Sequence, residues 1–185
     1  ADLSLLTSTS VNAAFSGNTP FSGNLGKAKV TVSGNSTMEL IFGATTTTET
    51  SFILESSEST LKGSASLLDT LTSSGDGTTE VLDLHSTPTA DLSLLTSTSV
   101  NAAFSGNAAF SGNLGKAEVN INNSNNMTLD GATMGTSSFV VDSGSTLIGP
   151  ASLLSGVTSR GAGAITVSDL HEKLDADLSF HNSSY

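Results

Sequence analysis

The chain of 185 residues contains no cysteine and no tryptophan. Without cysteine there is no disulfide framework, no thiolate metal site and no cysteine nucleophile. Only six lysine and arginine residues stand against seventeen aspartate and glutamate residues, which gives a formal net charge of -11. Because nucleic-acid binding needs basic residues to neutralise phosphates, we expect no nucleic-acid partner. No apolar run approaches the roughly 18 residues that a membrane-spanning helix needs, so we also expect no membrane insertion.

Small polar residues make up about half of the chain, with 33 Ser, 25 Thr, 18 Gly and 13 Asn. The apolar fraction is 36%, below the roughly 45–50% typical of soluble domains. Charged residues account for only 12%, so charge repulsion does little to hold the chain open. We therefore expect an ordered fold that needs few bulky core residues. The absence of cysteine, the acidity and this composition favour an extracellular or cell-surface protein.

A long internal repeat is the strongest signal in the sequence. Residues 1–30 and 90–119 agree at 27 of 30 positions, which chance cannot produce. Weaker agreement continues to the Asp-Leu-His of residues 83–85, which recurs at 169–171, and residues 176–179 repeat the opening Ala-Asp-Leu-Ser. We predict the following organisation: a first repeat unit over 1–89, a second over 90–175, and the start of a third repeat or an exchange strand over 176–185.

Short apolar runs recur about every 8–10 residues, separated by Ser-Gly, Gly-Asn, Asn-Asn and Asp-Gly turn signals. The alternation of Val30 with Val32, and of Val119 with Ile121, indicates strands with one buried face. No window shows the apolar spacing of an amphipathic helix. In the second repeat the runs predict strands at 100–104, 108–110, 117–121, 127–129, 139–141, 146–148, 152–154 and 165–167.

These short strands predict an all-β fold of two tandem repeats of about 88 residues. We favour a β-solenoid, in which each strand stacks on the turn before it and rungs of roughly 20–25 residues give about four per repeat. The alternative is a pair of tandem immunoglobulin-like β-sandwiches, whose size and strand number also fit. The low aromatic content and the three prolines favour the solenoid.

The composition and short motifs of the chain resemble those of the passenger regions of bacterial surface adhesins and autotransporters. The residues that carry this resemblance are the Phe-Ser-Gly-Asn tetrapeptides at 15–18, 21–24, 104–107 and 110–113, together with the segment 141–147. The resemblance implies an extracellular, non-enzymatic role, either structural or adhesive.

One sequence resembles the catalytic loop of aspartic peptidases. Asp142 opens the run Asp-Ser-Gly-Ser-Thr after the strand-like residues 139–141. Such an enzyme needs two carboxylates that face each other and share a proton. The aligned region of the first repeat, residues 55–58, lacks the glycine, so a single loop would need a symmetric dimer. A strand followed by a Ser-Gly turn is the simpler interpretation.

Two other sets contain residue types that bind metals or transfer protons in known proteins. Asp83 and His85, repeated as Asp169 and His171, would share one face of a strand and could orient an imidazole. The carboxylates of Glu172, Asp175 and Asp177 cluster near His171 and could bind calcium, although no EF-hand loop accompanies them. We expect no other cofactor. The simpler interpretations are an exposed polar pair and a solvated acidic loop.

We therefore expect a non-catalytic extracellular structural protein, either a self-assembling filament or surface-layer subunit or the stalk of an adhesin. Its expected partner is itself, through strand addition at the open ends of the repeat array, with host or surface glycans as further partners. A carbohydrate-binding module is the alternative, but the near absence of tryptophan and tyrosine removes the usual stacking surfaces for sugars.

Overall fold

A computed structural model describes residues 2–6, 11–172 and 175–183. Strands account for 47% of the chain and helices for 8%, and the strands stack in parallel as a β-solenoid of about 8 turns. These observations confirm the predicted all-β class and the preferred solenoid. The immunoglobulin-like sandwich, which is built from antiparallel sheets, is not the architecture of the described residues.

The chain forms two compact units whose boundaries differ from those of the sequence repeats. The first unit comprises Ala1–Leu82 and Leu92–Asn101, and the second comprises Asp83–Asp91 and Ala102–Tyr185. Residues 92–101, which open the second sequence repeat, therefore belong to the first structural unit.

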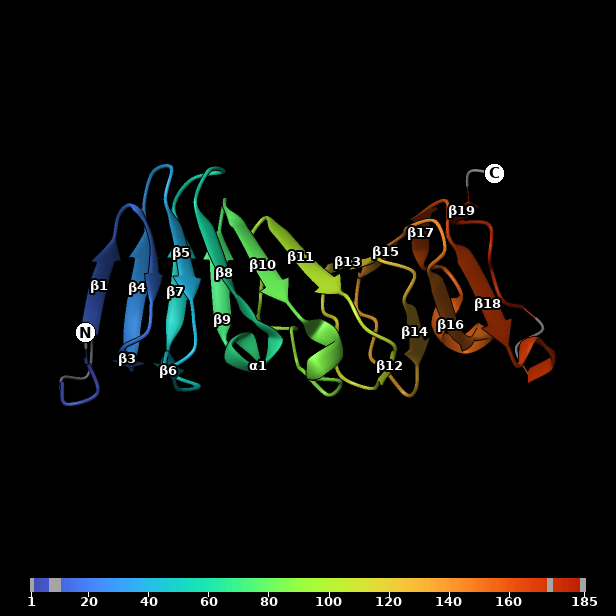
Figure 1. Ribbon diagram of the computed structural model, residues 1–185, viewed down its shortest axis with the longest axis horizontal. Helices are drawn as coiled ribbons and strands as arrows, with labels where there is room; N and C mark the ends of the chain where they lie inside the picture. The colour runs from blue at the N-terminus through green and yellow to red at the C-terminus, as the bar shows by residue number, and fades with distance from the viewer. Residues whose placement is uncertain (1, 7–10, 173–174, 184–185) are drawn as a thin grey trace. The chain divides into compact units, whose positions relative to one another are not determined.

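In the first unit the turns of the chain stack on one another, and their strands form two parallel sheets (Figure 1). One sheet has the order β1 (Val11–Phe15), β4 (Ala28–Val32), β7 (Ser51–Leu54) and β9 (Thr72–Gly75). The other contains β2 (Asn18–Phe21), β5 (Thr37–Leu40), β8 (Thr60–Ser64) and β10 (Thr78–Leu82). The short pair β3 (Asn24–Gly26) and β6 (Thr45–Thr46), together with helix α1 (Ala65–Leu68), completes the turns, and β11 (Ser99–Phe104) runs from the first unit into the second.

The second unit repeats this arrangement. One sheet has the order β12 (Ala108–Phe110), β14 (Asn126–Leu129), β16 (Thr146–Pro150) and β18 (Ala164–Ser168). The other contains β13 (Glu118–Ile121), β15 (Ser138–Val141), β17 (Thr158–Gly161) and β19 (His181–Ser183). Its helices are α2 (Ala151–Leu154) and two short 3-10 helices, η1 (Leu84–Ser86) and η2 (Leu170–Glu172).

Successive turns stack in register, and alternate side chains point into a thin core. Val11 pairs with Ala28, and Thr37 pairs with Thr60, so one turn takes from 17 to 23 residues. In β4 the even spacing places Val30 and Val32 in the core while Lys29 is exposed. Two or three small or medium apolar side chains per strand, such as Ala28, Val30 and Val32 in β4, fill such a core because the next turn covers each of them.

Two local predictions were wrong. Residues 152–154, predicted as a strand, lie in helix α2, where Ala151 and Leu154 are buried three positions apart, as on one helix face. Strand β17 was not predicted, because its sequence Thr-Ser-Arg-Gly contains no apolar residue and it buries only Ser159. It is a strand because it pairs with β15 on one side and β19 on the other.

Close stacking of the turns requires glycine at one matched position in each repeat. Gly75 and Gly161 have φ angles of +99° and +118°, in the region that favours glycine. A Cβ atom at either position would lie 2.2 Å from a backbone carbonyl oxygen of the preceding turn, that of Leu54 or Val141. The backbone there cannot move away, so any other residue would adopt a strained φ angle and its Cβ would clash with the carbonyl oxygen.

We expect Gly161→Ala to lower the free energy of unfolding by roughly 2–5 kcal/mol, because left-handed strain and overpacking add. Gly156→Ala is the matched control: its φ is +73° but no atom lies within 4 Å of the added Cβ, so only about 1 kcal/mol of strain is expected. Urea denaturation of both variants measures the difference. Equal losses would contradict the close contact with Val141.

Candidate interface at the terminal turns

Identical side chains are buried in the second repeat and partly exposed in the first. The three inward-facing apolar residues of β1, Val11, Ala13 and Phe15, are each half-buried. Their counterparts in β11 are buried, with exposed fractions of 3% or less: Val100, Ala102 and Phe104. Since the two sequences are the same at these positions, the difference arises from position in the stack. Strands β1 and β2 lie at the edges of their sheets, so among the described residues no further strand stacks on these apolar side chains.

The last turn of the second unit shows the reverse relation. Leu84 is 0% exposed, whereas its counterpart Leu170 is 52% exposed. Val81 in β10 is buried, but the matching Val167 in β18 is only half-buried. An open hollow of about 840 Å³ lies on this turn, and its lining includes Ile165, Val167, Leu178 and His181. The turn therefore exposes the residues that the first repeat buries.

Contacts inside the second unit show how such a turn is covered. The ring of His85 packs edge-on against Phe104, with centroids 6.1 Å apart. Gly106 lies so close to this histidine that an added Cβ would be 2.2 Å from its ring. Gly17, the counterpart of Gly106 in the first repeat, has no atom within 4 Å of that position. The first turn thus carries the same glycine without a histidine beneath it, and there the backbone of Gly17 has a φ angle of +109°.

The predicted Asp-x-His pairs do not lie on strands. Asp83 and Asp169 have left-handed φ angles of 53° and 57° and lead into the 3-10 helices η1 and η2. Although all four residues are described, no hydrogen bond joins either aspartate to its histidine. His85 is packed by the next turn, whereas His171 is exposed beside Glu172, with 3.9 Å between Nε2 and Oε1. The structure therefore does not place either aspartate to orient its imidazole.

The predicted calcium ligands are not brought together. Across residues 2–6, 11–172 and 175–183, no group of three or more His, Asp or Glu side chains is placed to hold a metal ion. Glu172 lies in η2 beside His171, and the carboxylate of Asp177 is engaged by Ser179. Together with Asp175, these residues form an acidic region at the last turn, with no metal-binding geometry in the described part of the chain.

Asp142 lies exposed in the turn between β15 and β16. Its backbone carbonyl accepts a hydrogen bond from the amide of Ser145 at 2.9 Å, which makes the predicted Ser-Gly turn. Among the described residues its carboxylate has no hydrogen bond or ion pair, and so no facing carboxylate shares its proton as an aspartic peptidase requires. The geometry fits a turn.

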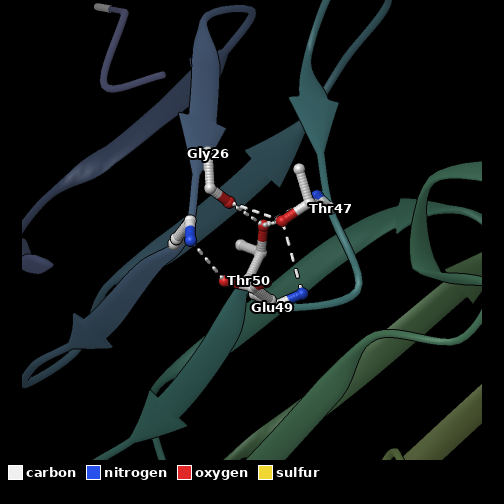
Figure 2. Close-up of polar contacts among 5 residues, drawn as sticks. Gly26, Thr47, Glu49 and Thr50 are labelled. Carbon is white, nitrogen blue, oxygen red and sulfur yellow. Dashed lines mark hydrogen bonds and ion pairs between the residues drawn. The ribbon is translucent and has the colours of Figure 1, made fainter. Parts of the chain in front are cut away.

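Hydroxyl clusters at the corners of the turns were not predicted. The hydroxyls of Thr47 and Thr50 both donate to the carbonyl oxygen of Gly26 in the preceding turn, at 2.9 and 2.5 Å, and the amide of Glu49 donates to Thr47 Oγ1 (Figure 2). A second hydroxyl cluster has the same spacing: the hydroxyls of Ser56 and Ser59 both donate to the carbonyl oxygen of Gly34 at 2.9 Å. Two hydroxyl residues three positions apart, some 20 residues after a glycine, are the sequence signal that identifies them.

The two ends of the chain carry the same local turn. Ser4 donates to Asp2 Oδ1 from its amide at 3.0 Å and from its hydroxyl at 2.6 Å. Ser179 makes the same two bonds to Asp177 Oδ1, at 3.0 and 2.6 Å. The side-chain bond, followed by the backbone bond, lowers the pKa of each aspartate below its ordinary value, because both bonds stabilise the ionised form.

We expect Ser179→Ala to raise the pKa of Asp177 towards its ordinary value and to leave the pKa of Asp2 unchanged. Because the folded pKa is lowered, the turn is stabilised above the unfolded pKa and loses this contribution as pH falls through the folded pKa. Side-chain carboxyl carbon shifts, followed by NMR from neutral to acid pH, measure both groups. Ser4→Ala is the matched control and should move only Asp2; an ordinary pKa for Asp177 in the unaltered chain would contradict the turn.

No helix in the described part of the chain has the length and hydropathy that a membrane span requires. Comparisons with protein-family models, with curated proteins and with solved structures found no match.

Proposed function

We propose that the chain is a non-catalytic extracellular structural protein whose copies add end to end. The first turn of one copy covers the last turn of another, as residues 102–110 cover η1 within the second unit. One observation carries the proposal: Leu84 is fully buried where the following turn is present, and Leu170, the same residue of the next repeat, is 52% exposed. The partner that fits this surface is therefore already encoded in the chain.

The two surfaces match because their sequences match. Residues 11–30 of a second copy differ from residues 100–119, the segment that follows the first repeat, at only three positions: 19, 20 and 29. Phe15 would lie where Phe104 lies, and would contact His171 as Phe104 contacts His85. Each newly buried leucine or phenylalanine side chain contributes about 1.5–3 kcal/mol when fully covered.

Strand edges supply direction and specificity to this contact. Edge strands present backbone N–H and C=O groups that pair readily with another chain. Here β1 and β2 at one end, and β18 and β19 at the other, are the outermost strands of their sheets. Because the two surfaces are different, the contact is head-to-tail and repeats without closing unless the rotation brings it into a ring. Open repetition gives a filament.

Charge modulates the association. Glu172, Lys173 and Asp175 stand where the first repeat has Ser86, Thr87 and Thr89, so these positions of the last turn carry one more negative charge than those of the internal junction. The net charge of -11 also opposes close approach of two copies. Added salt screens such repulsion, with a Debye length of about 8 Å at physiological ionic strength, so assembly is expected to strengthen as salt rises.

The test is a concentration series by sedimentation velocity, with negative-stain electron microscopy of the same samples. We expect the average mass to rise with concentration, and Leu170→Glu to shift the series to about tenfold higher concentration or more, because a carboxylate replaces a leucine that becomes buried. Phe42→Glu is the matched control: Phe42 is 100% exposed and lies between β5 and β6, in the second turn of the stack and outside the last turn.

A monomer at every concentration, with short isolated rods on the grid, would contradict end-to-end assembly and favour an adhesin stalk. An equal shift for Leu170→Glu and Phe42→Glu would mean that apolar surface in general, and not the last turn, drives association.

A further inference from the structure

A short segment already occupies part of the surface on which a second copy would add. We propose that residues 177–183, the place-holder segment, hold in the unassembled chain the position that the first residues of a second copy take on assembly. The incoming residues displace the place-holder segment, so that assembly proceeds by strand exchange. This inference rests on the proposed end-to-end assembly and specifies how the last turn is opened to its partner.

The exchanging segments have the same fold before they meet. In each copy of the Asp-Leu-Ser sequence, a backbone N–H donates to the carbonyl three residues earlier: Leu6 to Leu3 at 3.1 Å, Leu95 to Leu92 at 3.0 Å and His181 to Leu178 at 3.3 Å. The Asp–Ser side-chain bond is present in both terminal segments at 2.6 Å. A second copy therefore presents its first residues already shaped for the position.

The place-holder segment docks as the matching residues dock in the first unit. Leu95 pairs with Ser73, and His181 pairs with Ser159 at the same place one repeat later. Each serine amide also donates to the residue before its partner at 3.2 Å: Ser73 to the carbonyl of Leu94 and Ser159 to that of Phe180. Residues 178–183 thus stand on the second unit as residues 92–97 stand on the first.

One side chain distinguishes the place-holder segment from its replacement. Leu95 is 0% exposed in the first unit, but the place-holder segment puts the half-buried His181 at this position. A second copy offers Leu6, which is 48% exposed in its own first turn. Exchange buries this leucine, which is favourable, and returns to water an imidazole that is only half-buried.

The exchange leaves no polar group without a partner. His181 now bonds Ser159 through Nδ1 at 2.8 Å and the carbonyl of Leu154 through Nε2 at 3.1 Å. That carbonyl also accepts the amide of Val157 at 3.2 Å. In the first unit the counterpart Ser73 bonds the hydroxyls of Thr79 at 2.9 Å and Ser97 at 3.5 Å. Ile165 stands in place of Thr79 in the second repeat, so Ser8 of a second copy, the counterpart of Ser97, is the hydroxyl that would bond Ser159.

The opposite exchange is less favourable. If the place-holder segment stayed and residues 2–6 of the second copy were displaced, His181 would remain in a position that the first unit fills with a buried leucine. The incoming segment also keeps its own contact, because the bridge from Asp2 to Asn24 in the first repeat recurs from Asp91 to Asn113 while Leu95 is docked.

The experiment uses a fluorescent peptide of residues 1–12, whose sequence is identical to residues 90–101, and the full 185-residue chain below its assembly concentration. Fluorescence anisotropy reports binding. We expect His181→Leu to weaken binding about tenfold, because the place-holder then matches the buried leucine, and His181→Asp to strengthen it by a similar factor. Asp130→Leu, a change to leucine at an exposed residue between β14 and β15, should leave binding unchanged.

A second readout follows His181 directly. On addition of the peptide, the imidazole signals of His181 in an NMR spectrum should move to those of a solvent-exposed histidine, while a peptide carrying Leu6→Asp should leave them in place. Equal binding by all three chains, or no displacement of His181 at saturating peptide, would overturn the exchange.

Failure of the exchange and failure of assembly are separable. A chain that assembles in the concentration series, but whose assembly is unaffected by His181→Leu, assembles without exchange. A chain that stays monomeric but binds the peptide with the expected order of affinities retains the exchange site, and only the proposed end-to-end assembly is then wrong.

Discussion

In-register parallel stacking is the interaction on which the rest of this structure depends. The N–H and C=O groups of each strand point along the stack, so they are satisfied only by the turns before and after. The core side chains of one turn are likewise covered by the next, which is why Ala28 and Val30 can be fully buried with so few aromatic residues in the chain. A solenoid turn is incomplete alone, and the first and last turns inherit this incompleteness.

The duplication makes the consequence visible within one molecule. Phe15 and Phe104 have the same neighbours in sequence, yet one is half-buried and the other is fully buried. Intrinsic propensity cannot account for this, because the local sequences are the same; only a preceding turn distinguishes them. The buried copy therefore defines the geometry that the open copy would adopt on meeting a partner, including the contact of the phenylalanine with a histidine ring.

Much of the fold was predictable from the alternation of apolar residues and from turn signals, and the repeat itself was plain. The misses occur where contacts with other parts of the chain, rather than the local sequence, decide the structure. Strand β17 contains no apolar residue and exists because β15 and β19 flank it, whereas Ala-Ser-Leu-Leu forms helix α2 where the chain turns a corner. The acidic residues near 172–177 were predicted from spacing as metal ligands, but a spacing rule cannot reveal that a nearby serine engages Asp177.

Stacking also constrains where charge can be placed, because identical residues in register would bring like charges within one strand spacing, about 4.8 Å. The sequence avoids this. Lys62 lies in register between Glu39 and Glu80, and Arg160 reaches Glu118 with two charge-assisted bonds of 2.6 and 2.9 Å. The scarce basic residues thus separate carboxylates along the sides of the turns. At the last turn, Glu172, Lys173 and Asp175 replace Ser86, Thr87 and Thr89, a net gain of one negative charge. In the proposed assembly the apolar match favours addition of a further copy, while this charge opposes it. Ionic strength is therefore the variable that sets the balance between them.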